Sequence, residues 1–140
     1  MLALASRLLT GVAPWRSEDA AARAVRGWVE ASIDAVHDAD EPGAPVLVAL
    51  RHDRIAGFVT TGTRQHWSGD VDAYVGELVV AEDLAGQGIG QSLMSSAEQW
   101  ARSAGYTRLT IETGAGNRTA RQFYTALGYL EEEVVLSQAL

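Results

Sequence analysis

The sequence predicts an α/β fold (an α+β mixed sheet), in which an antiparallel meander is followed by strand, helix, strand, helix and strand. Three observations support this. Short apolar and β-branched runs separated by polar turns fill residues 46–80. Apolar residues recur at helical spacing from Ile89 to Ala104, and a shorter helical pattern follows Asn117. Because strands come first and then alternate with helices, we expect helices on the faces of a mixed sheet.

In the first half, residues 1–12 are expected to form the first strand rather than a targeting signal, because Arg7 interrupts the apolar run. Ser17 can cap a helix that carries acidic residues in its first turn and ends at residues 40–45. The apolar face of that helix is Val25, Val29, Ile33 and Val36.

The strands that follow are Val46–Arg51, 55–61 and Val71–Val80. The turn His52, Asp53, Arg54 joins the first two strands into a hairpin. A polar loop over residues 62–69 precedes the strand Val71–Val80. These three strands are the predicted meander.

The second half begins with the clearest helix of the chain, which ends at Gly105, a residue able to take the left-handed cap conformation. Its predicted buried face is Ile89, Leu93, Ala97, Trp100 and Ala104. Leu109 and Ile111 form a strand. Asn117 caps a last helix with Ala120, Phe123 and Leu127 on one face, which ends at Gly128, and residues 129–136 are expected to close the sheet.

Length and composition limit the kind of protein. The 140 residues, 47% hydrophobic and 21% charged, fit a single globular domain spanning 1–140. The net charge of −7 argues against nucleic-acid binding and fits a cationic partner. No apolar run has the length of about 18 residues that a membrane span needs. The chain has no cysteine, which excludes disulfides and thiol nucleophiles, and a cytoplasmic location fits.

A glycine-rich loop lies between the strand that ends at Val80 and the following helix. Gly86, Gly88 and Gly90 let the backbone turn tightly and bring successive N–H groups onto one anion, beside the positive end of the helix dipole. Two interpretations are open: a pyrophosphate site, or a plain strand-to-helix turn. A nucleoside-triphosphate loop is excluded because the chain has no lysine, and the dinucleotide spacing fails because Gln91 or Leu93 stands at its last glycine position.

Residues 77–129 resemble the core of the GNAT superfamily of N-acetyltransferases. The family signature is Gln or Arg, two residues, Gly, one residue, then Gly or Ala, and Ala85, Gly88 and Gly90 occupy these positions. Ala85 departs from the signature, since it lacks the long side chain of Gln or Arg. The run from Asn117 through Phe123-Tyr124 to Leu127-Gly128-Tyr129 is similar to the second family motif.

This resemblance implies a GNAT-like acyl-CoA N-acyltransferase fold and acetyl-CoA as co-substrate. It implies that the fourth predicted strand, Val71–Val80, holds the pantetheine arm, with a main-chain N–H near Val80 polarising the thioester carbonyl. It also implies that Tyr124 protonates the leaving CoA thiolate. The CoA-binding residues implied are Leu78, Val80, Ala85, Gly86, Gln87, Gly88, Ile89, Gly90, Gln91 and Asn117.

Transfer needs a neutral amine, so a base must take a proton directly or through water. Glu77 is the first candidate, since it lies beside the expected thioester between apolar neighbours. The alternative is a solvent-facing glutamate on a strand with one wet face. Asp72 and Asp70 are second candidates. For Asn117, a helix cap alone would also account for the residue.

The predicted function is therefore transfer of an acetyl group from acetyl-CoA to a primary amine of a small molecule or peptide, by direct attack in a ternary complex. The alternative is a catalytically inactive acyl-CoA-binding sensor or interaction module with the same fold. No metal is expected, because His37, His52 and His66 lie in separate elements. A homodimer is compatible with the sequence. The residues suggested for a cationic acceptor are Trp15, Trp28, His66, Trp67, Asp70 and Asp72.

Overall fold

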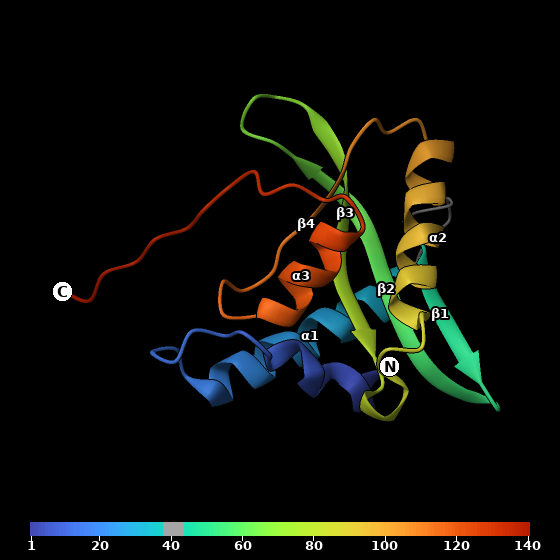
Figure 1. The fold of residues 1–140 in the computed structure, drawn as a ribbon, viewed down its shortest axis with the longest axis horizontal. Coiled ribbons are helices and arrows are strands. Elements are labelled where there is room, and N and C mark those ends of the chain that lie inside the picture. Colours follow the sequence, from blue (N-terminus) through green and yellow to red (C-terminus); the bar gives the residue numbers. More distant parts are fainter. Residues whose placement is uncertain (38–43) are drawn as a thin grey trace.

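The computed structural model describes residues 1–37 and 44–140, and a mixed sheet forms the centre of the fold (Figure 1). Its strands are β1 (Val46–Arg51), β2 (Arg54–Gln65), β3 (Val71–Val80) and β4 (Leu109–Ile111). They lie side by side in the order β1-β2-β3-β4. The first three are antiparallel neighbours, whereas β3 and β4 run parallel. The predicted antiparallel meander and the mixed sheet are confirmed.

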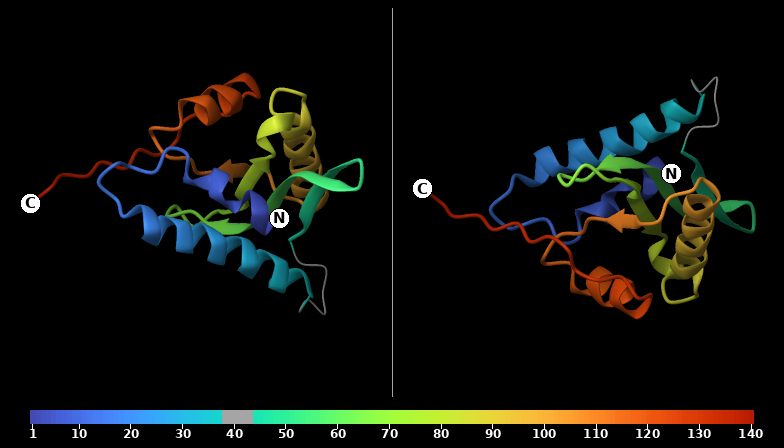
Figure 2. Two further views of the ribbon diagram at one scale, coloured as in Figure 1. Left: turned by 90° about the horizontal axis from the view of Figure 1, so that it is seen from below. Right: turned by 90° about the horizontal axis from the view of Figure 1, so that it is seen from above.

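Helices cover both faces of the sheet (Figure 2). One face carries the 3₁₀ helix η1 (Leu2–Leu9) and α1 (Glu18–His37), which enclose a core with Phe58 and Val79. The other face carries α2 (Ile89–Ser103) and α3 (Arg118–Ala126), packed over Val59 and Val75. A short 3₁₀ turn, η2 (Glu82–Leu84), connects β3 to the glycine loop. The two sides are called the α1 face and the α2 face below.

The predicted helix caps form in the structure. The Ala20 N–H donates to Ser17 Oγ at 3.3 Å, and the Ala120 N–H donates to Asn117 Oδ1 at 3.1 Å. Gly105, one residue beyond the cap of α2, has φ +86° as expected for a left-handed stop. The predicted end of α1 at residues 40–45 falls mostly on residues 38–43, outside the described ranges.

The apolar faces of the helices are partly as predicted. Val25 and Val29 are buried in α1, but Val36 is half exposed near its end. In α2 the buried residues are Leu93, Met94, Ala97 and Ala101, so the face is rotated away from the predicted Ala104, which is exposed. Neighbouring positions on one side of the helix can both be buried, so the period of apolar residues gives the direction of the buried face only approximately.

The β1–β2 hairpin has a tight turn made by His52 and Asp53, with φ of +48° and +59°. Two consecutive left-handed residues are typical of the type I′ turn, whose twist matches that of the strands. The loop predicted over residues 62–69 is wrong in its first part. Strand β2 continues to Gln65 and pairs with the start of β3, because Thr63, Arg64 and Gln65 find ladder partners in Ala73, Asp72 and Val71.

Residues 1–12 do not form the predicted first strand; most of them form η1. Met1, Leu4, Ala5 and Leu8 pack against the α1 face, and this spacing of three to four residues is helical. The prediction relied on apolar content and missed its period.

Residues 129–136 do not close the sheet either. They form no strand, and Leu130, Val134, Val135 and Leu136 are exposed. Three glutamates interrupt the apolar residues, so the alternation that would give this segment a buried face is absent. Glu131 pairs with Arg121, and Glu133 lies 3.7 Å from His66, before the chain leaves the body of the molecule (Figure 1).

Within the described ranges, no helix is both long and apolar enough to cross a bilayer. In the same part of the chain, no three His, Asp or Glu side chains gather as a potential set of metal ligands.

Candidate functional site

A β-bulge divides strand β3 into two parts. In the β2–β3 ladder, Thr61 faces Val75 and Val59 faces Leu78, so the single residue Thr60 lies opposite both Gly76 and Glu77. One strand therefore has an extra residue at this point. Residues beyond the bulge are shifted by one position relative to a regular strand.

The bulge reverses the direction of the backbone N–H groups. Before it, the Ala73 N–H donates to Arg108 O of the segment entering β4, at 3.1 Å. After it, the Ala81 N–H donates to Ala56 O on the β2 side, at 2.8 Å. Because N–H groups alternate along a strand, those of Leu78 and Val80 point away from β2. These are the two residues predicted to hold the pantetheine.

On the side to which these N–H groups point, the neighbouring strand β4 does not extend as far as Leu78 and Val80. The β3–β4 ladder joins Ala73, Tyr74 and Val75 to β4 and ends at Ile111. Within residues 1–37 and 44–140, residues 76–80 therefore have no β-ladder partner on this edge, and they lie next to β2 on the other edge only. Such an edge can hydrogen-bond an extended ligand as an added strand.

Glu77 is buried, with 7% of its surface exposed, on the α1 face. Its carboxylate oxygen Oε2 accepts a short hydrogen bond from Thr60 Oγ1 and a longer one, 3.5 Å, from Ser32 Oγ of α1. The Glu77 N–H donates to Thr60 Oγ1 at 2.8 Å. The interpretation of Glu77 as a solvent-facing glutamate is therefore wrong, whereas its role as a base stays a prediction.

The glycine loop exposes its backbone. Gly86 and Gly88 have φ of +75° and +81°, and no heavy atom lies within 4 Å of where a Cβ would stand on either residue. The first hydrogen bond at the start of α2 runs from the Ser92 N–H to Gly88 O at 3.0 Å. The N–H groups of Ile89, Gly90 and Gln91 precede it and have no acceptor within the helix. The loop and the first turn of α2 thus offer free main-chain donors of the kind that bind a phosphate.

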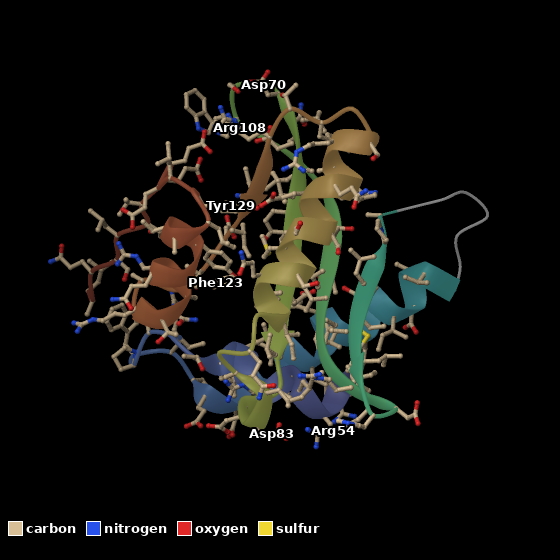
Figure 3. All side chains as sticks on the ribbon, turned by 45° about the vertical axis from the view of Figure 1, so that its right-hand side comes forward. Arg54, Asp70, Asp83, Arg108, Phe123 and Tyr129 are labelled. Carbon is tan, nitrogen blue, oxygen red and sulfur yellow. The ribbon has the colours of Figure 1, made fainter. Side chains whose placement is uncertain are left out.

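Two residues of the loop, Ala85 and Gln87, have hydrogen bonds within the protein. The Ala85 N–H donates to Glu82 O at 3.2 Å and closes η2, so this amide is occupied within the protein. The Gln87 side chain accepts a 3.4 Å hydrogen bond from Arg51 of β1, which brings a cation beside the loop. Arg54 and Asp83 form an ion pair at the same end of the molecule (Figure 3), and the hydrogen bond from Arg54 lowers the pKa of the Asp83 carboxyl.

Tyr124 lies on the α2 face among the residues that pack between α2 and α3. Its ring makes edge contacts with Phe123 and Tyr129, at centroid distances of 5.3 and 5.9 Å. Burial raises the pKa of Tyr124 to about 12, so the phenol is neutral at any ordinary pH. Tyr124 and Glu77 therefore lie on opposite faces of the sheet, and the unpaired edge of β3 runs between these faces.

Two neighbours of Tyr124 have structural partners. The Tyr129 hydroxyl donates to Glu98 Oε1 of α2 at 3.2 Å, and burial together with the Glu98 charge raises the pKa of Tyr129. Phe123 packs where α2 begins: a Cβ on Gly90 would lie 3.3 Å from its ring and 3.6 Å from Val80 (Figure 3 labels Phe123 and Tyr129). Gly90 thus allows α2 and α3 to approach next to the end of β3.

The Asn117 side chain caps α3, because its Oδ1 accepts a hydrogen bond from the Ala120 N–H. A Cβ on Gly11 would lie 2.5 Å from the Asn117 Cβ, so the segment after η1 packs tightly on this cap. The structure therefore supports the capping interpretation and leaves a contact of Asn117 with pantetheine as a prediction. Arg121, on the same helix, pairs with Glu131.

The second-choice bases lie far from the bulge. Asp72 is buried at the start of β3, roughly 16 Å from Glu77 at the usual strand rise. Asp70 accepts a 2.7 Å hydrogen bond from Ser68 and lies at the end of the molecule opposite Asp83 (Figure 3). Both belong to the part of the sheet away from the glycine loop.

The residues suggested for the acceptor lie in separate places. His66 and Trp67 are adjacent in the β2–β3 turn, with ring centroids 4.9 Å apart, and the His66 ring also bonds Ser68. Trp67 is 84% exposed, while Trp15 and Trp28 stand exposed before and on α1. The structure does not bring these aromatic side chains into one enclosed pocket.

In the described part of the chain, a small hollow of about 310 Å³ lies between α1 and the paired ends of β1 and β2. Ser32 lines this hollow and also donates to the Glu77 carboxylate. A larger hollow of about 780 Å³ lies between η1, the β1–β2 turn and η2, with the Arg7–Glu82 ion pair on its rim. The small hollow is lined by Ala31, Ser32, Ala35, Ala44, Val46 and Thr61.

The profile of the acetyltransferase (GNAT) family matches residues 7–129, most of the chain. The chain belongs to this family. The matched range contains the bulge, the glycine loop and α3, so the resemblance inferred from the two motifs is confirmed.

Relatives of known name and structure agree with the assignment. Aminoalkylphosphonate N-acetyltransferase of Salmonella typhimurium is 30% identical over 105 residues, which are 71% of this chain and 66% of that protein. A protein of Pyrococcus furiosus described as an acetyl transferase has a TM-score of 0.73 over 99% of this chain and 91% of its own, and at 18% identity it supports the fold alone.

A Bacillus anthracis protein described as a streptothricin acetyltransferase, solved in complex with acetyl coenzyme A, is 28% identical with a TM-score of 0.55. That similarity covers 64% of this GNAT chain and 48% of the other. The chain spans between 42% and 66% of the length of the curated relatives that it matches.

Three residues around the site were missed by the sequence analysis: Thr60, Gly76 and Ser32. A signal existed for one of them, because a glycine inside an otherwise apolar strand often marks a bulge. No local pattern identifies Thr60 or Ser32, since each reaches Glu77 from a different element. The catalytic and CoA-binding roles of the predicted residues remain predictions.

Proposed function

We propose that this chain transfers an acetyl group from acetyl-CoA to a primary amine of a small molecule or peptide, by direct attack of the amine in a ternary complex. The observation that carries the proposal is the unpaired edge of β3, residues 76–80, which leads directly to the glycine loop. An extended pantetheine arm and a pyrophosphate joined to it match this pair of features. Membership of the GNAT family supplies the independent support.

The loop binds the pyrophosphate through main-chain donors. The N–H groups of Gly86, Gly88 and the first turn of α2 point to one anion, and the helix dipole adds to the attraction. The open space at Gly86 and Gly88 leaves room for phosphate oxygens. The side chain lost at Ala85 is not needed in this arrangement, and Arg51, held beside Gln87, adds positive charge.

The N–H groups of Leu78 and Val80 bond the pantetheine and the thioester. A donor aimed at the thioester oxygen stabilises the negative charge that develops when the amine attacks, and preorganised donors of this kind contribute about 3 kcal/mol. Since these N–H groups take no part in the β2 ladder, binding does not require any strand pairing to break.

Glu77 takes the proton of the attacking amine, directly or through a water molecule. Its carboxylate is buried on the same strand and only one residue before Leu78. A positioned general base contributes about 10²- to 10⁴-fold to the rate. The adjoining hollow of about 310 Å³ gives a small acceptor access from the α1 side, within the size range of ligand pockets.

Tyr124 acts on the other face, at the leaving thiolate. With a pKa of about 12 its hydroxyl is a weak acid, so we assign it first as a hydrogen-bond donor that stabilises the thiolate. An ordinary thiol has a pKa of about 8.5, which is about 3 to 4 units below that of Tyr124. Complete proton transfer from the phenol to the thiolate would therefore be unfavourable. Stabilisation and subsequent protonation from solvent are consistent with these values.

An acceptor that carries positive charge fits the net charge of −7. The Salmonella relative is named for N-acetylation of aminoalkylphosphonates, so an amino group is the acceptor that this name gives.

The test combines calorimetry of acetyl-CoA and CoA with a thiol-release assay over a panel of polyamines, aminoglycosides, aminoalkylphosphonates, amino acids and peptides. We expect CoA binding and release with at least one amine. Binding without release from any of them would favour an inactive acyl-CoA sensor. No binding of either form of the coenzyme would overturn the proposal.

A further inference from the structure

We propose that Thr60 is a positioning residue for the transfer reaction, whose hydroxyl fixes the β3 bulge and the Glu77 carboxylate as one unit. This inference rests on the proposed function, because it explains how the base and the main-chain donors are held in a fixed relation. The catalytic groups themselves remain Glu77 and the N–H groups beyond it.

The Thr60 hydroxyl makes two hydrogen bonds to a single residue. It accepts from the Glu77 N–H at 2.8 Å and donates to Glu77 Oε2. The hydroxyl thus acts as acceptor for the backbone of Glu77 and as donor to its side chain. With 3% of its surface exposed, Thr60 leaves water little access to either bond.

The first of these bonds replaces a missing ladder bond. At the bulge two residues of β3 face one residue of β2, so one of their N–H groups has no carbonyl opposite it. The Thr60 hydroxyl accepts from that N–H in place of a carbonyl. A buried N–H group without an acceptor is unfavourable, so the hydroxyl stabilises the bulged form over a regular strand.

Gly76 shows how closely the hydroxyl fits. A Cβ on Gly76 would lie 2.7 Å from Thr60 Oγ1, whereas φ of Gly76 is not in the left-handed region. Glycine is therefore required here for space and not for backbone conformation. The bulge accommodates a hydroxyl at position 60 only because position 76 has no side chain.

The bulge and the carboxylate must act together for the chemistry. Without the extra residue, the N–H groups of Glu77 and Val79 would point to the unpaired edge in place of those of Leu78 and Val80. The Glu77 side chain would then turn to the α2 face. The same Thr60 hydroxyl that stabilises the bulge also holds the carboxylate, which the longer bond from Ser32 supports from α1.

The experiment compares Thr60→Val, which keeps the shape and removes the hydroxyl, with Thr60→Ser, which keeps the hydroxyl. The control is Thr110→Val, which removes a hydroxyl that donates to Ala73 O at 3.3 Å in the fully paired part of the sheet. Measurements are kcat and KM with an accepted amine, calorimetry of CoA, and amide hydrogen exchange at Glu77.

For Thr60→Val we expect kcat to fall by about tenfold or more, as for the loss of a hydrogen bond to a charged group, and Glu77 amide exchange to become faster. Thr60→Ser should recover most of kcat and restore the slow exchange, and Thr110→Val should leave both unchanged. If Thr60→Val does not fold, Thr60→Ala serves the same purpose with less crowding.

The proposal is overturned if Thr60→Val keeps wild-type kcat and exchange, or if Thr60→Ser is as defective as Thr60→Val, since shape and not the hydroxyl would then matter. Amide exchange at Glu77 needs no substrate. A wild-type protein that binds no coenzyme and releases no thiol therefore refutes the proposed function, while the exchange data still decide whether the Thr60 hydroxyl holds the bulge.

Discussion

The two parts of strand β3 have the same kind of sequence but different surroundings. Before the bulge, Ala73 and its neighbours pair with β2 on one side and β4 on the other. After the bulge, Leu78 and Val80 lie opposite Val59 and Gly57 of β2, but their own N–H groups point away from β2 to the open edge. Backbone groups that are hydrogen-bonded in a ladder stabilise the fold, whereas backbone groups without a ladder partner are available to a ligand.

The buried carboxylates sharpen this comparison. Asp72 and Glu77 are equally buried, at 8% and 7% exposure, on the same strand. Asp72 belongs to the part paired on both sides, and Glu77 follows the bulge. Burial therefore does not distinguish the proposed base from the other buried carboxylate. The pairing of the surrounding backbone does.

The largest expected effect is on Glu77. Glu77→Gln should lower turnover by about 10²- to 10⁴-fold, because the amide cannot accept the amine proton, with little change in CoA affinity. Asp72→Asn, its matched counterpart, should keep most of the turnover. Steady-state kinetics on the two variants decide the matter, and the reverse order of effects would move the base to the start of β3.

The next effect concerns Tyr124. Tyr124→Phe should lower turnover about tenfold through loss of a donor to the thiolate, while Tyr106→Phe should not. Kinetics with the same amine measure both. Unchanged turnover in Tyr124→Phe would leave this side chain as packing only.

Tyr124 should also affect alkaline stability. Its pKa is about 12 in the folded chain and about 10 when unfolded, so the neutral form stabilises the fold fully below pH 10. That contribution is lost as pH rises through 12. Urea unfolding from pH 8 to about 11 should show a less steep loss in Tyr124→Phe, and equal slopes would contradict the raised pKa.

A smaller effect is expected at the glycine loop. Gly88→Ala and Gly105→Ala both place a side chain at positive φ in open space, so each should destabilise by about 1 kcal/mol. Only Gly88 belongs to the glycine loop, at the N-cap of α2. Calorimetry should show CoA affinity about fivefold weaker in Gly88→Ala and unchanged in Gly105→Ala, and equal affinities would place the coenzyme elsewhere.

The smallest effect is at Asn117. Asn117→Ala should destabilise by about 1 kcal/mol through loss of the α3 cap, whereas Asn117→Asp keeps an acceptor for the Ala120 N–H and should retain stability. Urea unfolding measures both. If Asn117→Asp also binds CoA normally, the residue acts as a cap only.

Several features could be predicted from the sequence because they depend on neighbours along the chain. The caps Ser17 and Asn117, the left-handed stop at Gly105 and the glycine loop follow from interactions within a few residues. The two family motifs likewise lie in continuous segments. The failures were also local in origin, because strand-like content was given more weight than its period. Residues 1–12 have a helical spacing of apolar residues, and residues 129–136 lack the alternation of a strand.

The sequence by itself determined the family, the order of elements from α1 to α3, and which residues could bind phosphate or move a proton. Only the tertiary structure decided the phase of β3, the face that Glu77 occupies and the part played by Thr60. The reason is physical: the direction of an N–H group in a strand depends on how many residues precede it in the ladder. That count changes at a bulge formed between Thr60 and Gly76, two residues that meet only when β2 and β3 pair.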